Sequence, residues 1–181
     1  MTTSGKTTLA IRLASFERAR GYSVFVLDPL KDKRWQADLI TSSTKQFMKS
    51  ATQSRNCSLF LDESGETVGR YNEEMFWLAT RARHFGHVSH FISQRATQLA
   101  PLVRDQCSHL FLFRVSNPDA KVLADSWSNE SLLEASKLDK FHFIYLQRFG
   151  KASRYILTRN GVATYESGNA IGVRNSSLLI N

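Results

Sequence analysis

Apolar positions recur along the chain in two patterns, one typical of helices and the other of buried strands. Over residues 7–20, Leu9, Leu13 and Phe16 fall on one face of a helix. Residues 57–61 are continuously apolar, which is typical of a strand that a parallel sheet buries on both faces. The predicted elements are helices over 7–20, 44–53, 72–84, 99–106, 118–127 and 131–136, and strands over 22–27, 57–61, 88–93, 109–115, 141–147 and 154–157.

The alternation of these elements predicts the fold class. Strands separated by helices favour a three-layer α/β sheet with mostly parallel strands. The last two predicted strands instead form a hairpin around Phe149-Gly150-Lys151. From Asn160 onward, scattered Gly, Asn and Ser predict a loose tail. We therefore expect one domain over residues 1–159 and a C-terminal tail over residues 160–181.

Composition adds a packed core to this prediction and excludes several protein classes. The chain has 181 residues, the length of one ordinary domain, and 42% of them are hydrophobic, which excludes global disorder. No run approaches the roughly 18 apolar residues of a membrane-spanning helix. Cys57 and Cys107 lack a CxxC partner, which favours reduced thiols in an intracellular, reducing environment over a disulfide framework or a zinc site.

The chain is basic, with 24 Lys and Arg against 16 Asp and Glu and a formal net charge of +8. Residues 1–62 carry ten basic and five acidic groups, residues 63–128 carry seven of each, and residues 129–181 carry seven and four. This excess predicts a polyanionic partner. The candidate contacts are Lys31, Lys33 and Arg34 in one cluster, and Arg148, Lys151 and Arg154 around the hairpin. Ordinary solvent-exposed charge is the alternative for both clusters.

The string Ser4-Gly5-Lys6-Thr7 opens the first predicted helix. It is the second half of the phosphate-binding motif G-x-x-x-x-G-K-[ST], in which backbone N–H groups and the helix N-terminus hold phosphate oxygens. Lys6 would reach the β- and γ-phosphates of a nucleotide, and the Thr7 hydroxyl would coordinate Mg²⁺. The first glycine of the motif and the strand that feeds it would precede Met1, so we hypothesise that the natural chain begins upstream.

Two carboxylates, Asp62 and Glu63, follow the apolar strand at 57–61. This arrangement suits the metal side of a nucleotide site. There, Asp62 would hold the Mg²⁺ shell through water, and Glu63 would orient and deprotonate an attacking water. A strand that simply ends at a polar turn is the alternative. The phosphate-loop string upstream favours the nucleotide site.

A third group of residues surrounds the strand predicted at 88–93. Gln94 follows this strand, where it could hydrogen-bond a γ-phosphate or the attacking water. Arg81 and Arg83 precede the strand, so they lie away from their own subunit's phosphate and could reach that of a neighbour as fingers in trans. Arginines that compensate a helix dipole are the alternative.

Taken together, these motifs resemble the FtsK/HerA-type DNA-translocating ATPases. The stretch ARHFGHVSHFISQR, residues 82–95, is similar to the family's block of A-R-x-x-G, an apolar strand and Q-R, and residues 112–117 are similar to its next strand. With SGKTT and LFLDE, the resemblance spans residues 4–147. It implies a RecA-like sheet of order 5-1-4-3-2, in which the missing first strand would lie between the strands at 88–93 and 109–115.

The resemblance also assigns roles to individual residues. Its phosphate loop is Ser4, Gly5, Lys6, Thr7 and Thr8. Asp62 joins Thr7 at the Mg²⁺, Glu63 acts on the attacking water, and Gln94 senses the γ-phosphate. Arg83 best matches the family's trans finger, and Arg81 is the second choice.

The family resemblance implies an ATP-hydrolysing motor, usually a homo-hexameric ring, that pulls double-stranded DNA through its pore by non-specific backbone contacts. A bare, small motor domain is typical of viral genome-packaging ATPases. We therefore expect packaging into a preformed capsid, in the host cytoplasm or at a virion vertex, with capsid or vertex proteins as partners. A cellular translocase or helicase, and a non-hydrolysing nucleic-acid-binding module, are alternatives. A small-molecule kinase is disfavoured, because no lid segment is evident.

Overall fold

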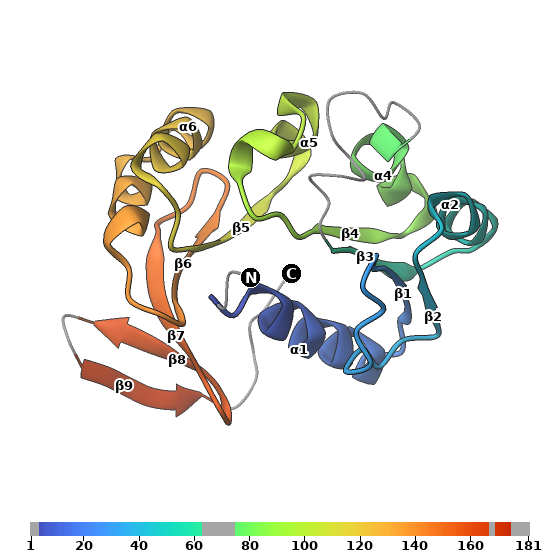
Figure 1. Cartoon of the computed structure of the whole chain (residues 1–181), viewed down its shortest axis with the longest axis horizontal. Coiled ribbons are helices and arrows are strands. Elements are labelled where there is room, and N and C mark those ends of the chain that lie inside the picture. Colours follow the sequence, from blue (N-terminus) through green and yellow to red (C-terminus); the bar gives the residue numbers. More distant parts are fainter. Residues whose placement is uncertain (1–3, 63–74, 167–168, 175–181) are drawn as a thin grey trace. The chain divides into compact units, whose positions relative to one another are not determined.

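The computed structural model describes residues 4–62, 75–166 and 169–174, which fold into two compact units (Figure 1). Residues 6–106 form the parallel-sheet unit. Residues 4–5, together with the chain from residue 107, form the antiparallel-sheet unit. Each unit contains one sheet.

The parallel-sheet unit is built on four parallel strands in the order β2-β1-β3-β4. They are β1 (Ser23–Leu27), β2 (Leu39–Thr41), β3 (Cys57–Leu61) and β4 (Val88–Phe91). The neighbours β1, β3 and β4 stand in the order expected of a RecA-like sheet. The sequence does not predict β2, because three residues carry too short a pattern to identify a strand.

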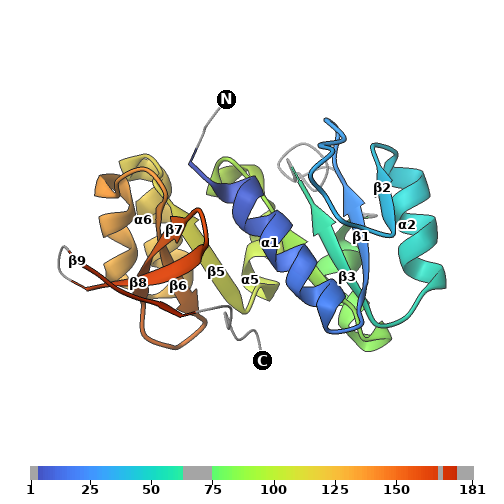
Figure 2. The ribbon, with the colours of Figure 1, turned by 90° about the horizontal axis from the view of Figure 1, so that it is seen from below.

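Helices cover both faces of this sheet and give the expected three layers (Figures 1 and 2). α1 (Lys6–Ala19) packs on one face, and α2 (Thr44–Gln53) and α4 (Phe76–Thr80) cover the other. β3 lies inside the sheet, and all five of its residues are buried. Leu59 and Leu61 belong to the apolar core beneath α2 and α4. The alternation of side chains along a strand places Phe60 on the face of α1.

Only part of the helix expected over residues 72–84 is described, because residues 63–74 lie outside the described ranges. The described part is α4, followed by the 3-10 helix η2 (Ala82–Phe85). Gly86 ends η2 with a φ of +75°, a left-handed conformation that glycine adopts without strain. The 3-10 helix η3 (Ala96–Gln98) and α5 (Pro101–Gln106) follow β4.

The antiparallel-sheet unit is a meander whose five strands pair in chain order. The strands are β5 (His109–Phe113), β6 (His142–Gln147), β7 (Ser153–Thr158), β8 (Gly161–Glu166) and β9 (Asn169–Arg174). Between β5 and β6 lie α6 (Asn117–Trp127) and the 3-10 helix η4 (Glu130–Lys137). β6 and β7 form the predicted hairpin.

Two features of this unit differ from the sequence-based expectations. β5, expected in the parallel sheet, instead pairs antiparallel with β6. Aromatic contacts favour this pairing, because the Phe113 and Phe143 ring centroids lie 5.1 Å apart across the two strands. The expected loose tail contains β8 and β9, which extend the sheet from the edge of β7. Both strands pair through their backbones beyond β7, and each contains one glycine, which weakens its strand pattern.

Candidate functional site

The candidate site begins at the amino end of α1. Gly5, directly before the helix, has a φ of +107°, and a Cβ atom there would lie 3.0 Å from Leu157 Cδ2. The backbone conformation therefore favours glycine, as the tight turn of a phosphate loop does, and a Cβ atom would crowd the Leu157 side chain. Lys6 is the first residue of α1, and Ser4 and Thr8 are half-buried.

Thr7 and Asp62 meet in the structure although 55 residues separate them in sequence. The Thr7 hydroxyl donates a hydrogen bond to Asp62 Oδ2 at 3.2 Å. Asp62 directly follows β3, and its backbone N–H donates to the Leu27 carbonyl at 2.9 Å, which extends the pairing of β3 with β1. This bond fixes the Asp62 carboxylate at the carboxyl edge of the sheet. The structure thus brings together the two residues that the sequence assigns to a metal ion.

Lys6 is electrostatically coupled to the same carboxylate. Burial lowers the pKa of the Lys6 ammonium group, because a charge loses hydration when it leaves water, while the negative charge of Asp62 raises it in part. A half-buried cation beside a buried carboxylate at a helix N-terminus is an environment suited to phosphate oxygens. The hydroxyl of Thr7 and the carboxylate of Asp62 are hard oxygen ligands, so their chemistry fits Mg²⁺.

Gln94 lies at the carboxyl edge of the sheet and is exposed. The backbone N–H of Ile92 donates to the Leu61 carbonyl at 2.9 Å, so the chain leaves β4 beside Asp62. The turn that follows is held by Gln98, whose Oε1 accepts a hydrogen bond from the Arg95 backbone N–H at 3.0 Å. The predicted water-activating residue, Glu63, lies outside the described residues.

Arg81 and Arg83 lie at the opposite edge of the sheet. Both are exposed, Arg81 just before η2 and Arg83 within it. Because η2 leads into the amino end of β4, these side chains start from the edge that lies away from Asp62. Their action on the nucleotide of a neighbouring subunit stays a prediction.

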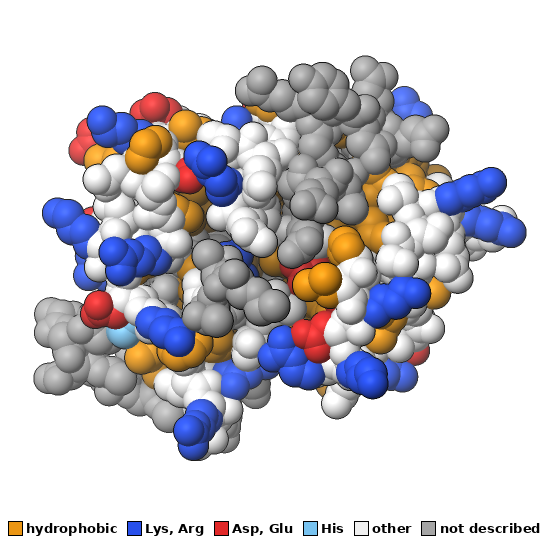
Figure 3. All heavy atoms as spheres, in the orientation of Figure 1, with side chains coloured by type: hydrophobic (Ala, Val, Ile, Leu, Met, Phe, Trp, Pro, Cys, Tyr) orange, Lys and Arg blue, Asp and Glu red, His pale blue; other side chains and the backbone are white. Residues whose placement is uncertain are grey.

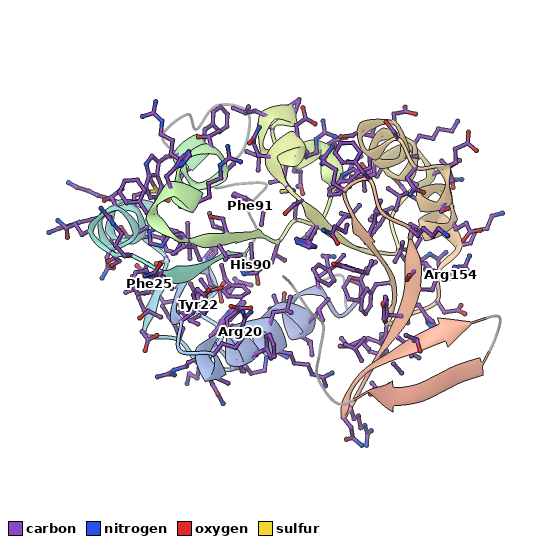
Figure 4. All side chains as sticks on the ribbon, turned by 180° about the vertical axis from the view of Figure 1, so that it is seen from behind. Arg20, Tyr22, Phe25, His90, Phe91 and Arg154 are labelled. Carbon is purple, nitrogen blue, oxygen red and sulfur yellow. The ribbon has the colours of Figure 1, made fainter. Side chains whose placement is uncertain are left out.

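The histidine of β4 joins two strands close to the site (Figure 4). His90 Nε2 lies 3.0 Å from the Ser58 hydroxyl, and the imidazole stacks on the ring of Phe60 with a centroid separation of 4.1 Å. These contacts hold β4 against β3 on the face that α1 covers. They add to the pairing between β4 and β3, the strand that Asp62 directly follows.

The residues predicted to contact DNA differ in how their side chains are engaged. Lys31 and Lys33, between β1 and β2, are exposed, as is Lys151 after the β6–β7 turn. Arg34 forms an ion pair with Asp32. Figure 3 shows that Lys and Arg side chains outnumber Asp and Glu on the face in view.

Two arginines near the hairpin serve the antiparallel-sheet unit itself. Arg148 Nε donates to the Cys107 carbonyl at 3.0 Å, and its guanidinium lies 4.2 Å from the centroid of the Trp127 ring. Arg154 forms an ion pair with Glu134 of η4 (Figure 4). Structural contacts therefore account for both side chains.

Asp28 is a residue to which the sequence assigns no role. It follows β1 just as Asp62 follows β3, and its exposed fraction is only 2%. The rule that singled out Asp62, a carboxylate after an apolar strand, applies equally to Asp28. The proline that follows it explains an Asp-Pro turn without any function, and this hides the signal.

Solved structures with the same fold include two viral NTPases. The genome packaging NTPase B204 from Sulfolobus turreted icosahedral virus 2, in complex with AMPPCP, is 16% identical, with a TM-score of 0.71 over 84% of this chain and 92% of that chain. B204, the DNA-packaging ATPase from Sulfolobus turreted icosahedral virus, has a TM-score of 0.67 at 16% identity, over 84% of this chain and 91% of that chain.

A bacterial structure is also similar. The N-terminal domain of zonular occludens toxin from Neisseria meningitidis is 13% identical, with a TM-score of 0.55 over 88% of this chain and 92% of that chain. No family model matches the chain. No curated protein matches it either. At these identities the likeness establishes the fold alone, an α/β fold that this chain shares with those proteins.

In the part of the chain that the structure describes, no helix has the length and apolar character needed to cross a membrane.

Proposed function

We propose that this protein is an ATP-hydrolysing motor that translocates double-stranded DNA and packages a viral genome into a preformed capsid. The observation that carries the proposal is the hydrogen bond between Thr7, at the start of α1, and Asp62, at the end of β3. It joins the phosphate-loop string to the carboxylate of the neighbouring strand in a P-loop NTPase fold. The likeness to viral packaging NTPases supports the choice of substrate.

The proposed nucleotide contacts follow from this geometry. Backbone N–H groups at Gly5 and Lys6 face the phosphates, and the Lys6 ammonium neutralises their charge. Thr7 and Asp62 would hold Mg²⁺, which neutralises charge that develops on the phosphate oxygens during transfer. Thr8 completes the loop.

Of the proposed hydrolytic residues that the structure describes, Gln94 lies at the carboxyl edge of the sheet, and Arg81 and Arg83 lie at the opposite edge. Glu63, directly after Asp62 in sequence, accepts the proton of the attacking water, and Gln94 contacts the γ-phosphate. Arg83, or secondarily Arg81, reaches the nucleotide of a neighbouring subunit. Their exposure at the opposite edge supports action in trans.

The assembly in this proposal is a homo-hexameric ring with DNA in its pore. Contacts to DNA are made to phosphates and are independent of base sequence. Lys31 and Lys33 are the best-supported contacts, because their side chains are exposed. The ring acts in the host cytoplasm and at the virion vertex, where it meets capsid or vertex proteins.

The experiment that tests the proposal measures ATP hydrolysis by the purified chain with Mg²⁺, with and without linear duplex DNA. We expect hydrolysis that DNA stimulates, and a loss of about 10²-fold or more in Lys6→Ala, which removes the phosphate-neutralising charge. Lys45→Ala, an exposed lysine of α2, is the matched control and keeps wild-type turnover. DNA binding without any nucleotide affinity would instead identify a non-hydrolysing nucleic-acid-binding module.

A further inference from the structure

The loop between β1 and β2 is folded around one buried carboxylate, that of Asp28. Asp28 Oδ1 accepts a hydrogen bond from the Leu30 backbone N–H at 2.8 Å. Asp28 Oδ2 accepts a second from the Asp32 backbone N–H at 2.8 Å and a third from Trp35 Nε1 at 3.1 Å. Three donors from both ends of the loop converge on one side chain, so the loop is held in a single shape.

Trp35 anchors the far end of this loop to the sheet. Its side chain is only 4% exposed, and its ring lies 5.6 Å from that of Phe60, tilted by 51°. An indole has a single hydrogen-bond donor, and here that donor is used on Asp28. Because the Trp35 ring packs against Phe60 of β3, the indole N–H that donates to Asp28 is held in a fixed position.

The part of the loop that faces solvent carries two lysines. Lys31 has a left-handed φ of +50°, which is uncommon outside glycine, and its backbone N–H donates to the Asp28 carbonyl at 3.2 Å. Among the described residues, neither the Lys31 nor the Lys33 ammonium group has an ion pair or a hydrogen bond. Leu30 beside them is 73% exposed. The fold thus holds the strained backbone of Lys31 in place and leaves the ammonium groups of Lys31 and Lys33 exposed to water.

Arg34, the third basic residue of the cluster, is used within the loop. Its Nη2 donates to Asp32 Oδ2 at 2.6 Å, its Nε lies 3.0 Å from the same oxygen, and its backbone N–H donates to Asp32 Oδ1 at 2.9 Å. These hydrogen bonds lower the pKa of Asp32. The pair is compact and internally neutral, so Arg34 has little charge to offer a ligand.

We infer that the loop 29–34 is a preformed phosphate-binding element in which Lys31 and Lys33 contact the DNA backbone, Asp28 is the positioning residue, and Arg34 is a strut held by Asp32. This inference rests on the proposed function and assigns different roles to the basic residues of the cluster Lys31, Lys33 and Arg34. A loop that is already shaped loses little conformational entropy on binding, which increases affinity. The ligand is the phosphate backbone of duplex DNA, and the readout that reports it is salt dependence.

The first test measures the affinity of the full chain for a duplex of unrelated sequence across a range of salt concentrations. Lys31→Ala and Lys33→Ala each weaken binding and reduce the slope of log affinity against log salt by about 0.9, one phosphate contact each. Arg34→Ala leaves the slope unchanged. An Arg34→Ala variant that lost as much slope as Lys33→Ala would overturn the assignment.

The second test uses the sign of a charge change. Asp28→Asn removes a negative charge, which by electrostatics alone strengthens binding to DNA. We expect it to weaken binding, with a loss similar to that of Lys31→Ala and Lys33→Ala combined, because the loop is no longer held. Asp125→Asn, an exposed carboxylate of α6, is the matched control and leaves affinity unchanged or raises it. Stronger binding by Asp28→Asn would contradict the positioning role.

A third variant keeps the proposal testable if Asp28→Asn does not fold. Trp35→Phe retains an aromatic ring against Phe60 but removes the donor to Asp28, so it weakens DNA binding while basal ATP hydrolysis stays at the wild-type rate. Trp77→Phe is its control and keeps wild-type affinity. A wild-type chain that bound no duplex at all would overturn both the proposed function and this inference. DNA binding with an unchanged slope in both lysine variants would overturn this inference alone.

Discussion

Asp28 and Asp62 are buried carboxylates that follow the neighbouring strands β1 and β3. A buried carboxylate is costly unless hydrogen bonds satisfy it. The Asp62 carboxylate accepts a hydrogen bond from the Thr7 hydroxyl. The Asp28 carboxylate accepts hydrogen bonds from two backbone N–H groups and from an indole N–H. The same chemistry at adjacent strand ends therefore shapes the β1–β2 loop at Asp28 and, in the proposed function, provides a metal ligand at Asp62.

His87 gives the fold a pH-dependent stability. This buried imidazole accepts a hydrogen bond from the Cys57 backbone N–H at Nδ1, and its Nε2 lies 3.0 Å from the Ala51 carbonyl, which requires the neutral ring. Burial is the largest cause that lowers its pKa below the ordinary 6.5. The unfolded chain then binds this proton more readily, so His87 contributes full stability above about pH 6.5 and progressively less as the pH falls through the folded pKa.

The measurement is urea unfolding of wild type and His87→Asn between pH 8 and pH 5. At pH 8 the variant is less stable by about 1–3 kcal/mol, because hydrogen-bond partners are left unsatisfied. The difference in the free energy of unfolding between wild type and His87→Asn narrows as the pH falls. His84→Asn, a change at an exposed histidine, is the control substitution. A gap between wild type and His87→Asn that stayed constant across this range would show that His87 does not titrate in this way.

A residue of the candidate site could be predicted from sequence when the residues that define its role lie close to it in the chain. Lys6, Thr7 and Asp62 lie in short strings whose spacing is typical of a nucleotide site, so sequence alone made them candidates. Their contact required the sheet that places β3 beside α1. Arg148 shows the opposite case, because it contacts Cys107 and Trp127, which are far from it in sequence. No local pattern could separate it from an exposed arginine.

At the level of elements, local sequence patterns predicted two boundaries in full. Both α2 and β3 have the boundaries expected from sequence, although the helical pattern over residues 44–53 is weaker than the continuous apolar run over residues 57–61. β2 is too short to carry a pattern, and β8 and β9 consist partly of glycine and small polar residues. Their pairing depends on the open edge of β7. Tertiary context therefore decides the elements that sequence missed.

Gly86 sets the turn from η2 into β4. Its φ is +75°, and a Cβ atom there would lie 2.0 Å from Asn56 Oδ1. We expect Gly86→Ala to lower the free energy of unfolding by about 1–3 kcal/mol, through both backbone strain and displacement of Asn56. Urea unfolding measures this loss.

Gly21→Ala is the matched control, because Gly21 has a similar φ of +88° but nothing within 4 Å of an added Cβ. The Gly21→Ala variant carries only the backbone strain, so its free energy of unfolding falls by about 1 kcal/mol. Equal losses in the two variants would show that Asn56 moves aside without cost.

For the whole molecule, the proposal places one ATP site between two subunits, with Lys6 from one and Arg83 from its neighbour. Lys6→Ala and Arg83→Ala are each inactive alone. Mixed in equal amounts, they recover part of the wild-type ATPase rate, because some interfaces combine an intact Lys6 with an intact Arg83. Steady-state hydrolysis across mixing ratios measures this recovery.

A mixture of Lys6→Ala and Glu63→Gln is the control for this experiment. Both changes fall on the same side of the interface, so every site keeps one defect and the mixture stays inactive. Rings that form from Lys6→Ala and Arg83→Ala but recover no activity would rule out Arg83 as a finger in trans. Recovery with Arg81→Ala in its place would transfer the role to Arg81.

The central claim is that ATP hydrolysis moves this protein along duplex DNA. The most direct test is displacement of a labelled third strand from a triplex placed downstream on a linear duplex. Wild type with ATP and Mg²⁺ should release the strand, whereas Glu63→Gln should bind DNA and nucleotide and release none. Release by Glu63→Gln, or no release by a wild-type protein that binds DNA and hydrolyses ATP, would contradict the account.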